Sequence, residues 1–116
     1  QELEQTTQEE SSESIRERVV MAHKRQRERY EKEGFFYNSQ IPAKKIATFC
    51  ALKKDEKRHM QQIYETLNLS VRSYHKILKT ARTIADIEGS EEIRMEHLHE
   101  AICYRSIDSN FWERRR

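Results

Sequence analysis

The residues best suited to chemistry lie at the start of a predicted helix over residues 70–89. Apolar side chains recur there at helical spacing, and Ser70 and Gly89 are residue types that begin and end helices. The first turn contains Arg72 and no acid, although the free amides of a helix start favour acids. A guanidinium beside such amides can bind an anion, above all a phosphate. We therefore predict an anion site at Ser70 and Arg72.

Two other residues of this helix were considered for the site. His75 lies one turn after Arg72 and either flanks the anion site or packs into the core. Arg82 is spaced to pair with Asp86 at i,i+4 rather than to join the site. The alternative for Arg72 itself is an exposed arginine without a role.

The sequence offers no other complete catalytic or metal-binding motif. It lacks the glycine-rich GxxxxGK[ST] loop, so this chain alone is not expected to hold a triphosphate. His97 and His99 fall on different sides of a helix, and His99 with Cys103 supplies two ligands rather than the three or four of a zinc site. We therefore predict no metal site. Cys50 and Cys103 have apolar neighbours and are expected to be buried free thiols in a reducing cytoplasm.

The positive charge is unevenly distributed. The net charge is +2, and residues 1–13 contain five glutamates and no lysine or arginine, so the rest carries about +7. A nucleic-acid-binding module is one interpretation, and a solvated helix surface is the other. The candidate phosphate contacts are Arg16, Arg18, Lys24, Arg25, Arg27 and Arg29. Glutamates interleaved among them weaken the nucleic-acid interpretation.

Composition predicts the architecture that must position these residues. A chain of 116 residues with 2 Gly and 1 Pro favours long helices and few loops. We predict an all-α bundle of about five helices: a linker or disordered segment over residues 1–10, a helical domain over 11–105 and a tail over 106–116. The helices are expected from a capping box at Ser14 to about residue 33, after Pro42, over 55–67, over 70–89 and over 95–104. Asn68 is expected to end the third helix in a left-handed turn, Ile15 to face the core, and Tyr104 to lie in the core or an interface. The aromatic run Phe35–Tyr37 is expected to plug the bundle or, alternatively, to stack on bases.

The resemblance to a known family rests on four segments that occur in the family's order. They are ESSESIRERVVMAHKRQRER, YNSQIPAKKIATFCAL, LNLSVRSYHKILKTARTIADIEGSEEI and EHLHEAICYR. Together they resemble the C-terminal domain of the Mg chelatase-like AAA+ ATPases, in their competence-associated branch, over about residues 10–105. Met95 departs from the pattern, because a proline commonly opens the last helix in the family.

The resemblance implies a role that the residues alone do not establish. Family members are similar to three-part proteins with a Lon-protease-like domain, a P-loop ATPase core and a helical lid, and this chain resembles the lid, cut from a longer protein. Ser70-Val71-Arg72 matches the S/T-x-R motif in which a sensor-2 arginine reaches the γ-phosphate. The implied cofactors are ATP and Mg²⁺, bound by the longer protein and not by this chain alone. The implied partners are the ATPase core of the same chain, neighbouring subunits of a hexameric ring and DNA, with no membrane and a cytoplasmic location.

One further interpretation competes with the lid. The chain could be a helical interaction domain without a ligand, in which case other parts of the bundle should cover the helix start at Ser70. The exposure of that helix end therefore distinguishes the two.

Overall fold

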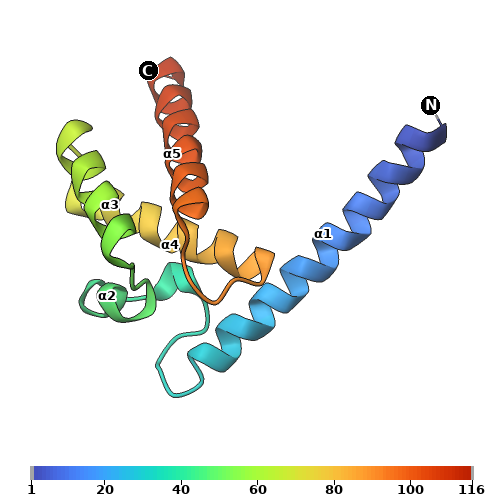
Figure 1. Ribbon diagram of the computed structural model, residues 1–116, viewed down its shortest axis with the longest axis horizontal. Helices are drawn as coiled ribbons and strands as arrows, with labels where there is room; N and C mark the ends of the chain where they lie inside the picture. Colours follow the sequence, from blue (N-terminus) through green and yellow to red (C-terminus); the bar gives the residue numbers. More distant parts are fainter. Residues whose placement is uncertain (1, 116) are drawn as a thin grey trace.

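The protein folds into helices, as its composition predicts. The computed structural model describes the backbone of residues 2–115 and the side chains of residues 12–105. The elements, in chain order, are α1 (Glu2–Arg29), the 3₁₀ turns η1 (Asn38–Gln40) and η2 (Ala43–Lys45), α2 (Ile46–Phe49), α3 (Lys54–Thr66), α4 (Val71–Glu88) and α5 (Met95–Arg115) (Figure 1). Residues 2–115 contain no strand, and the predicted all-α fold with five helices is confirmed.

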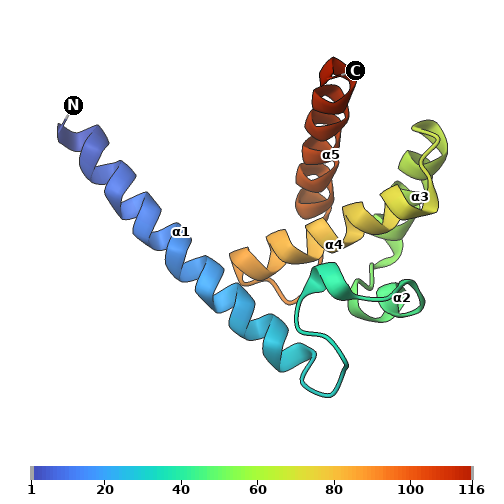
Figure 2. The same ribbon diagram turned by 180° about the vertical axis from the view of Figure 1, so that it is seen from behind.

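Helix α4 is the centre of the molecule. It packs against α1, α5, α2 and η1. In both views its C-terminal end lies beside α1, and α5 projects from it on the same side as α3 (Figures 1 and 2). The buried core is formed by Tyr30, Ile41, Ile46, Cys50, Met60, Leu69, Ile77, Leu78, Ala81, Ile93, Leu98 and Ala101. Burial of these apolar side chains is the main favourable contribution to folding.

Helix α1 is longer than predicted and extends past the bundle. It begins at Glu2, so Ser14 lies inside the helix and the capping box predicted there is wrong. The backbone of residues 2–10, predicted as a linker, continues this helix. In both views the N-terminal half of α1 projects away from the other elements (Figures 1 and 2). Ile15, predicted to face the core, is therefore 50% exposed, whereas Ala22 further along is buried.

The aromatic run after α1 divides between core and surface. Phe35 packs beside Tyr30 and Phe49, with ring centroids 4.7 and 6.1 Å away respectively. Phe36 and Tyr37 are exposed, so the predicted plug consists of Phe35 alone. The contacts of Phe35 with Tyr30 and Phe49 close this corner of the core, and the rings of Phe36 and Tyr37 remain largely exposed.

Local signals set most helix ends correctly. Asn68 and Gly89 both adopt positive φ, of 50° and 79°, and end α3 and α4 as predicted. Helix α5 begins at Met95 despite the missing proline, because the His97 Nδ1 accepts the Arg94 backbone N–H at 2.8 Å. The backbone of α5 runs to Arg115, past the predicted end at residue 104. Phe111 and Trp112 lie outside the described side chains.

Two further surface assignments differ from prediction. Cys103 is exposed on α5, because the apolar face of that helix turns Leu98 and Ala101 inward instead. Tyr104 is 51% exposed for the same reason. Within the described residues, none of the helices combines the length and apolar character needed to cross a membrane.

Candidate anion site at the start of helix α4

The start of α4 has a well-formed N-cap. Ser70 has extended backbone angles, and its Oγ accepts the Ser73 backbone N–H at 3.1 Å. This cap satisfies one of the amides that a helix start leaves without an intrahelical partner. No acidic residue occupies the first turn. The remaining amides and the positive end of the helix dipole therefore face outward without a neutralising carboxylate.

Arg72 is available to an external ligand. Ser70, Val71 and Arg72 are all exposed, and Val71 retains 58% of its accessible surface. Among the described side chains, none forms a hydrogen bond or ion pair with the Arg72 guanidinium. Nothing in the described part of the bundle covers this helix end, which argues against the ligand-free interaction domain.

His75 lies at the edge of the same region. It is partly buried, and its ring centroid lies 6.2 Å from that of Tyr74. Both rings line a pocket of about 260 Å³ whose other walls come mainly from α2 and the segment after it. His75 therefore packs against the bundle, and its role beside Arg72, one helical turn away, stays a prediction.

The opposite end of α4 holds a buried polar network centred on Asp86. This carboxylate is fully buried and accepts two hydrogen bonds from the Arg29 guanidinium, at 2.6 and 3.0 Å. Arg82 Nη2 approaches the same carboxylate at 3.1 Å, which confirms the predicted i,i+4 pair. Asn38 Nδ2 donates to it at 2.9 Å, so α1, η1 and α4 are joined at one anion.

Burial and neighbouring charges shift the pKa values of Arg29 and Tyr30 in opposite directions. Burial alone would lower the pKa of Arg29, but the hydrogen bond and attraction to Asp86 outweigh it and raise that pKa. Burial raises the pKa of the neighbouring Tyr30, with Arg29 partly opposing the shift. Tyr30 donates its hydroxyl to Asn38 Oδ1. Arg29 is therefore a charged structural group.

The six basic residues proposed as phosphate contacts do not form one surface. Arg29 is bound to Asp86, and Arg25 Nη1 donates to the Asp86 backbone carbonyl at 2.7 Å. Four members remain exposed: Arg16, Arg18, Lys24 and Arg27. Glutamates lie among them on α1, and a module that depends on these side chains for DNA binding is correspondingly weakened.

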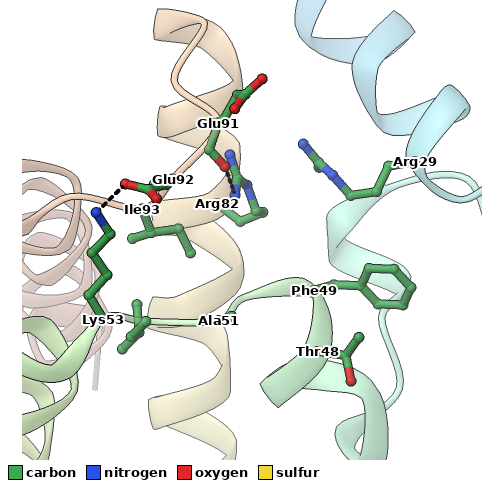
Figure 3. Close-up of a pocket in the computed structure, with 10 residues that line it drawn as sticks. Arg29, Thr48, Phe49, Ala51, Lys53, Arg82, Glu91, Glu92 and Ile93 are labelled. Atoms are coloured by element: carbon green, nitrogen blue, oxygen red, sulfur yellow. Dashed lines mark hydrogen bonds and ion pairs between the residues drawn. The ribbon is translucent and has the colours of Figure 1, made fainter.

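A second pocket lies between the end of α1, α2 and the α4–α5 connection (Figure 3). It measures about 370 Å³, and Arg29, Arg82 and Phe49 line it. Lys53 and Glu92 form an ion pair of 2.8 Å at its edge, and Arg82 donates to the Glu91 carbonyl at 2.9 Å. The Arg82 Nε is buried without a hydrogen-bond partner among the described residues. Because that atom has no accessible surface, a molecule in the pocket does not reach it.

One group of potential metal ligands is better explained as a helix cap. Glu88, Glu96 and His97 place one ligand atom each within 4.8 Å of one another. The buried His97 accepts a backbone N–H at Nδ1, so its Nε2 carries the proton and donates to Glu88 at 2.5 Å. Because Nδ1 already accepts the Arg94 N–H, this proton cannot move there to free Nε2 for a metal, and the group is a hydrogen-bonded cap of α5.

The fold and this exposed helix start define a structural class: a small all-helical domain whose central helix begins at an exposed, acid-free first turn that contains an arginine. Residues 9–105 match the family model described as magnesium chelatase, subunit ChlI C-terminal. The chain therefore belongs to this family, as the four segments predict.

Two relatives show how much of a longer protein the match covers. The chain is 40% identical over 99 residues to the uncharacterized protein YifB of Salmonella typhimurium, covering 85% of this chain and 19% of YifB. It is 39% identical over 98 residues to the competence protein ComM of Haemophilus influenzae, covering 84% of this chain and 18% of ComM. The chain thus spans about a fifth of the length of these curated relatives. No solved structure matches the chain.

Sequence reasoning found Arg82 but missed the other two side-chain partners of Asp86. Arg29 was a candidate phosphate contact, and Asn38 was given no role. The available signal was spacing: Ala22, Gln26 and Arg29 recur at helical intervals, and the first two are buried. A polar residue that continues a buried stripe is expected to have a buried partner.

Proposed function

We propose that this chain is the helical lid of a Mg chelatase-like AAA+ ATPase. In this proposal it works within a longer protein whose P-loop core binds ATP and Mg²⁺, and Arg72 supplies a sensor-2-type contact to the γ-phosphate. The observation that carries the proposal is the open start of α4. Ser70 caps this helix end, the first turn has no acid, and Arg72 is exposed without a described partner. Family membership and the Ser70-Val71-Arg72 motif support it.

The proposed contact would couple nucleotide state to lid position. A charge-assisted hydrogen bond from Arg72 exists only while the γ-phosphate is present, so hydrolysis removes it. The same guanidinium would stabilise charge that develops on the phosphate without any proton transfer. Ser70 would orient the helix start, and His75 would flank the site.

The proposal extends to a ring-forming motor. Neighbouring subunits of a hexameric ring would contact the lid, and DNA would be the substrate. The resemblance to the competence-associated branch supports this extension, and one relative is named a competence protein.

The test is ATP turnover by the longer protein that contains this domain. Arg72→Ala should lower turnover at least about tenfold, which corresponds to about 1.4 kcal/mol of lost transition-state stabilisation. Arg72→Lys should retain part of the activity, because it keeps the charge but not the guanidinium geometry. Arg58→Ala, at an exposed position of α3, is the matched control and should leave turnover unchanged. Wild-type turnover in Arg72→Ala would reject the role of Arg72.

A further inference from the structure

Two histidine side chains meet between α3 and α5. The Nε2 atoms of His59 and His99 are 3.0 Å apart, and the two rings lie edge to face with centroids 4.9 Å apart. His59 is partly exposed and His99 is exposed, so both nitrogens can be reached from solvent. In the absence of another ligand, one imidazole donates its proton and the other accepts it.

The separation of these nitrogens suits a shared metal ion. Imidazole nitrogens bind Zn²⁺ at about 2.0–2.1 Å, which places two of them about 3.3 Å apart in a tetrahedral site and about 2.9 Å apart at a right angle. The observed 3.0 Å lies between these values. An ion could therefore replace the shared proton, which would move to the Nδ1 of its own ring, with side-chain shifts of a few tenths of an ångström.

Cys103 is a candidate third ligand on the same helix as His99. It lies four residues after His99 on α5, and side chains at i,i+4 are neighbours with Cβ atoms about 5–6 Å apart. It is exposed and not in a disulfide. Its Sγ does not lie within 4.8 Å of both nitrogens, so binding requires the thiol to turn toward them. Sequence alone supplied the pair of His99 and Cys103, and the structure adds His59 from 40 residues away.

We propose that His59, His99 and Cys103 bind a divalent transition-metal ion, with Zn²⁺ as the preferred ion, and that the ion clamps α3 to α5. Two imidazoles and a thiolate favour zinc over magnesium or calcium, which prefer oxygen ligands. A fourth position would remain open to water. The other thiol does not compete, because Cys50 is 2% exposed and burial raises its pKa to about 11.

The first test is zinc binding by the metal-free 116-residue chain in a non-thiol reductant. Calorimetric titration measures the binding, and thermal unfolding measures its effect on stability. Zinc should bind with one-to-one stoichiometry and raise the midpoint of unfolding. His59→Asn and His99→Asn should each raise the dissociation constant for zinc at least tenfold, which corresponds to a loss of about 1.4 kcal/mol of binding free energy. His23→Asn, at an exposed position of α1, is the matched control and should bind zinc as the wild type does.

Two results would overturn the site. One is the absence of any titratable zinc binding up to millimolar concentration. The other is zinc binding that survives both histidine substitutions. Midpoints measured without metal show whether each variant folds, so a lost response is not confused with a lost fold.

Cobalt tests the thiolate separately. Co²⁺ bound by a thiolate gives a near-ultraviolet charge-transfer band, and Cys103→Ser should abolish this band while Cys50→Ala should retain it. Binding of cobalt without the band would remove Cys103 from the site and refute the three-ligand proposal.

Discussion

The two ends of α4 use the same kind of side chain in opposite ways. Near its C-terminal end, Arg82 is 5% exposed and contacts Asp86 and two backbone carbonyls. At its N-terminal end, Arg72 is exposed and has no described partner within the chain. The difference lies in what packs over each end. Arg29 of α1 and Asn38 of η1 bind Asp86 at the first end, whereas at the second end α3 contacts Tyr74 but leaves residues 70–72 exposed.

This contrast separates a structural arginine from a candidate functional one. A buried guanidinium needs a carboxylate, because an isolated buried charge is strongly unfavourable. An exposed guanidinium has no such requirement and can remain free until a ligand arrives. Substitutions at the two ends should therefore affect different measurements, and the stability effects should differ by several-fold.

The largest effect on stability is expected at the covered end. Asp86→Asn removes the charge that both Arg29 and Arg82 contact, and the free energy of unfolding should fall by about 3 kcal/mol. Breaking a buried ion pair costs about 3–5 kcal/mol of stability. We expect the lower part of this range, because the Arg29 side chain is 23% exposed and can recover some hydration. Urea denaturation measures the change.

The matched control is Glu65→Gln, which neutralises an exposed carboxylate on α3 and should change stability by no more than about 0.5 kcal/mol. Equal effects of the two substitutions would show that the Asp86 network is not a main link between α1 and α4.

A second effect is expected at alkaline pH. Burial raises the pKa of Cys50 to about 11, with Arg82 and Arg29 partly opposing the shift. The unfolded thiol ionises near pH 8.5–9 while the folded one keeps its proton, so stability should fall by about 1.4 kcal/mol per pH unit between about 9 and 11. Urea denaturation across this range gives the slope.

Cys50→Ala should reduce that slope, whereas Cys103→Ala, which removes the exposed thiol, should not. If the slope is the same in both variants, Cys50 is hydrated in the folded protein and the covered region is less well packed than the structure indicates.

The sequence predicted the features that are decided locally. Ser70, Asn68 and Gly89 set helix ends through their own backbone preferences, and Arg82 and Asp86 are neighbours on one helix. Local signals also explain the error at Ser14, where a capping pattern was present but the helix continued through it. The capped, acid-free start of α4 was predictable for the same reason, because it consists of one helix start and its first turn.

Contacts between distant segments were not predictable in this way. Arg29 and Asp86 are 57 residues apart, and His59 and His99 are 40 apart. Periodicity places each residue on a face of its own helix but does not show which face of another helix it meets. Arg29 and Arg25 were therefore candidate contacts of a nucleic-acid surface, although both side chains bind Asp86 of α4.

The smallest effects are expected at the open end of α4, where they separate helix capping from ligand binding. Ser70→Ala removes the cap to the Ser73 amide and should lower the free energy of unfolding by about 1 kcal/mol. Arg72→Ala should change it by no more than about 0.5 kcal/mol, because the side chain is exposed and contacts no described partner. Urea denaturation of both variants gives the comparison. A loss at Arg72 as large as that at Ser70 would mean that the guanidinium supports the bundle, and the contrast between the two ends of α4 would no longer hold. A stable Arg72→Ala variant whose longer protein hydrolyses ATP slowly would instead assign the arginine to the nucleotide alone.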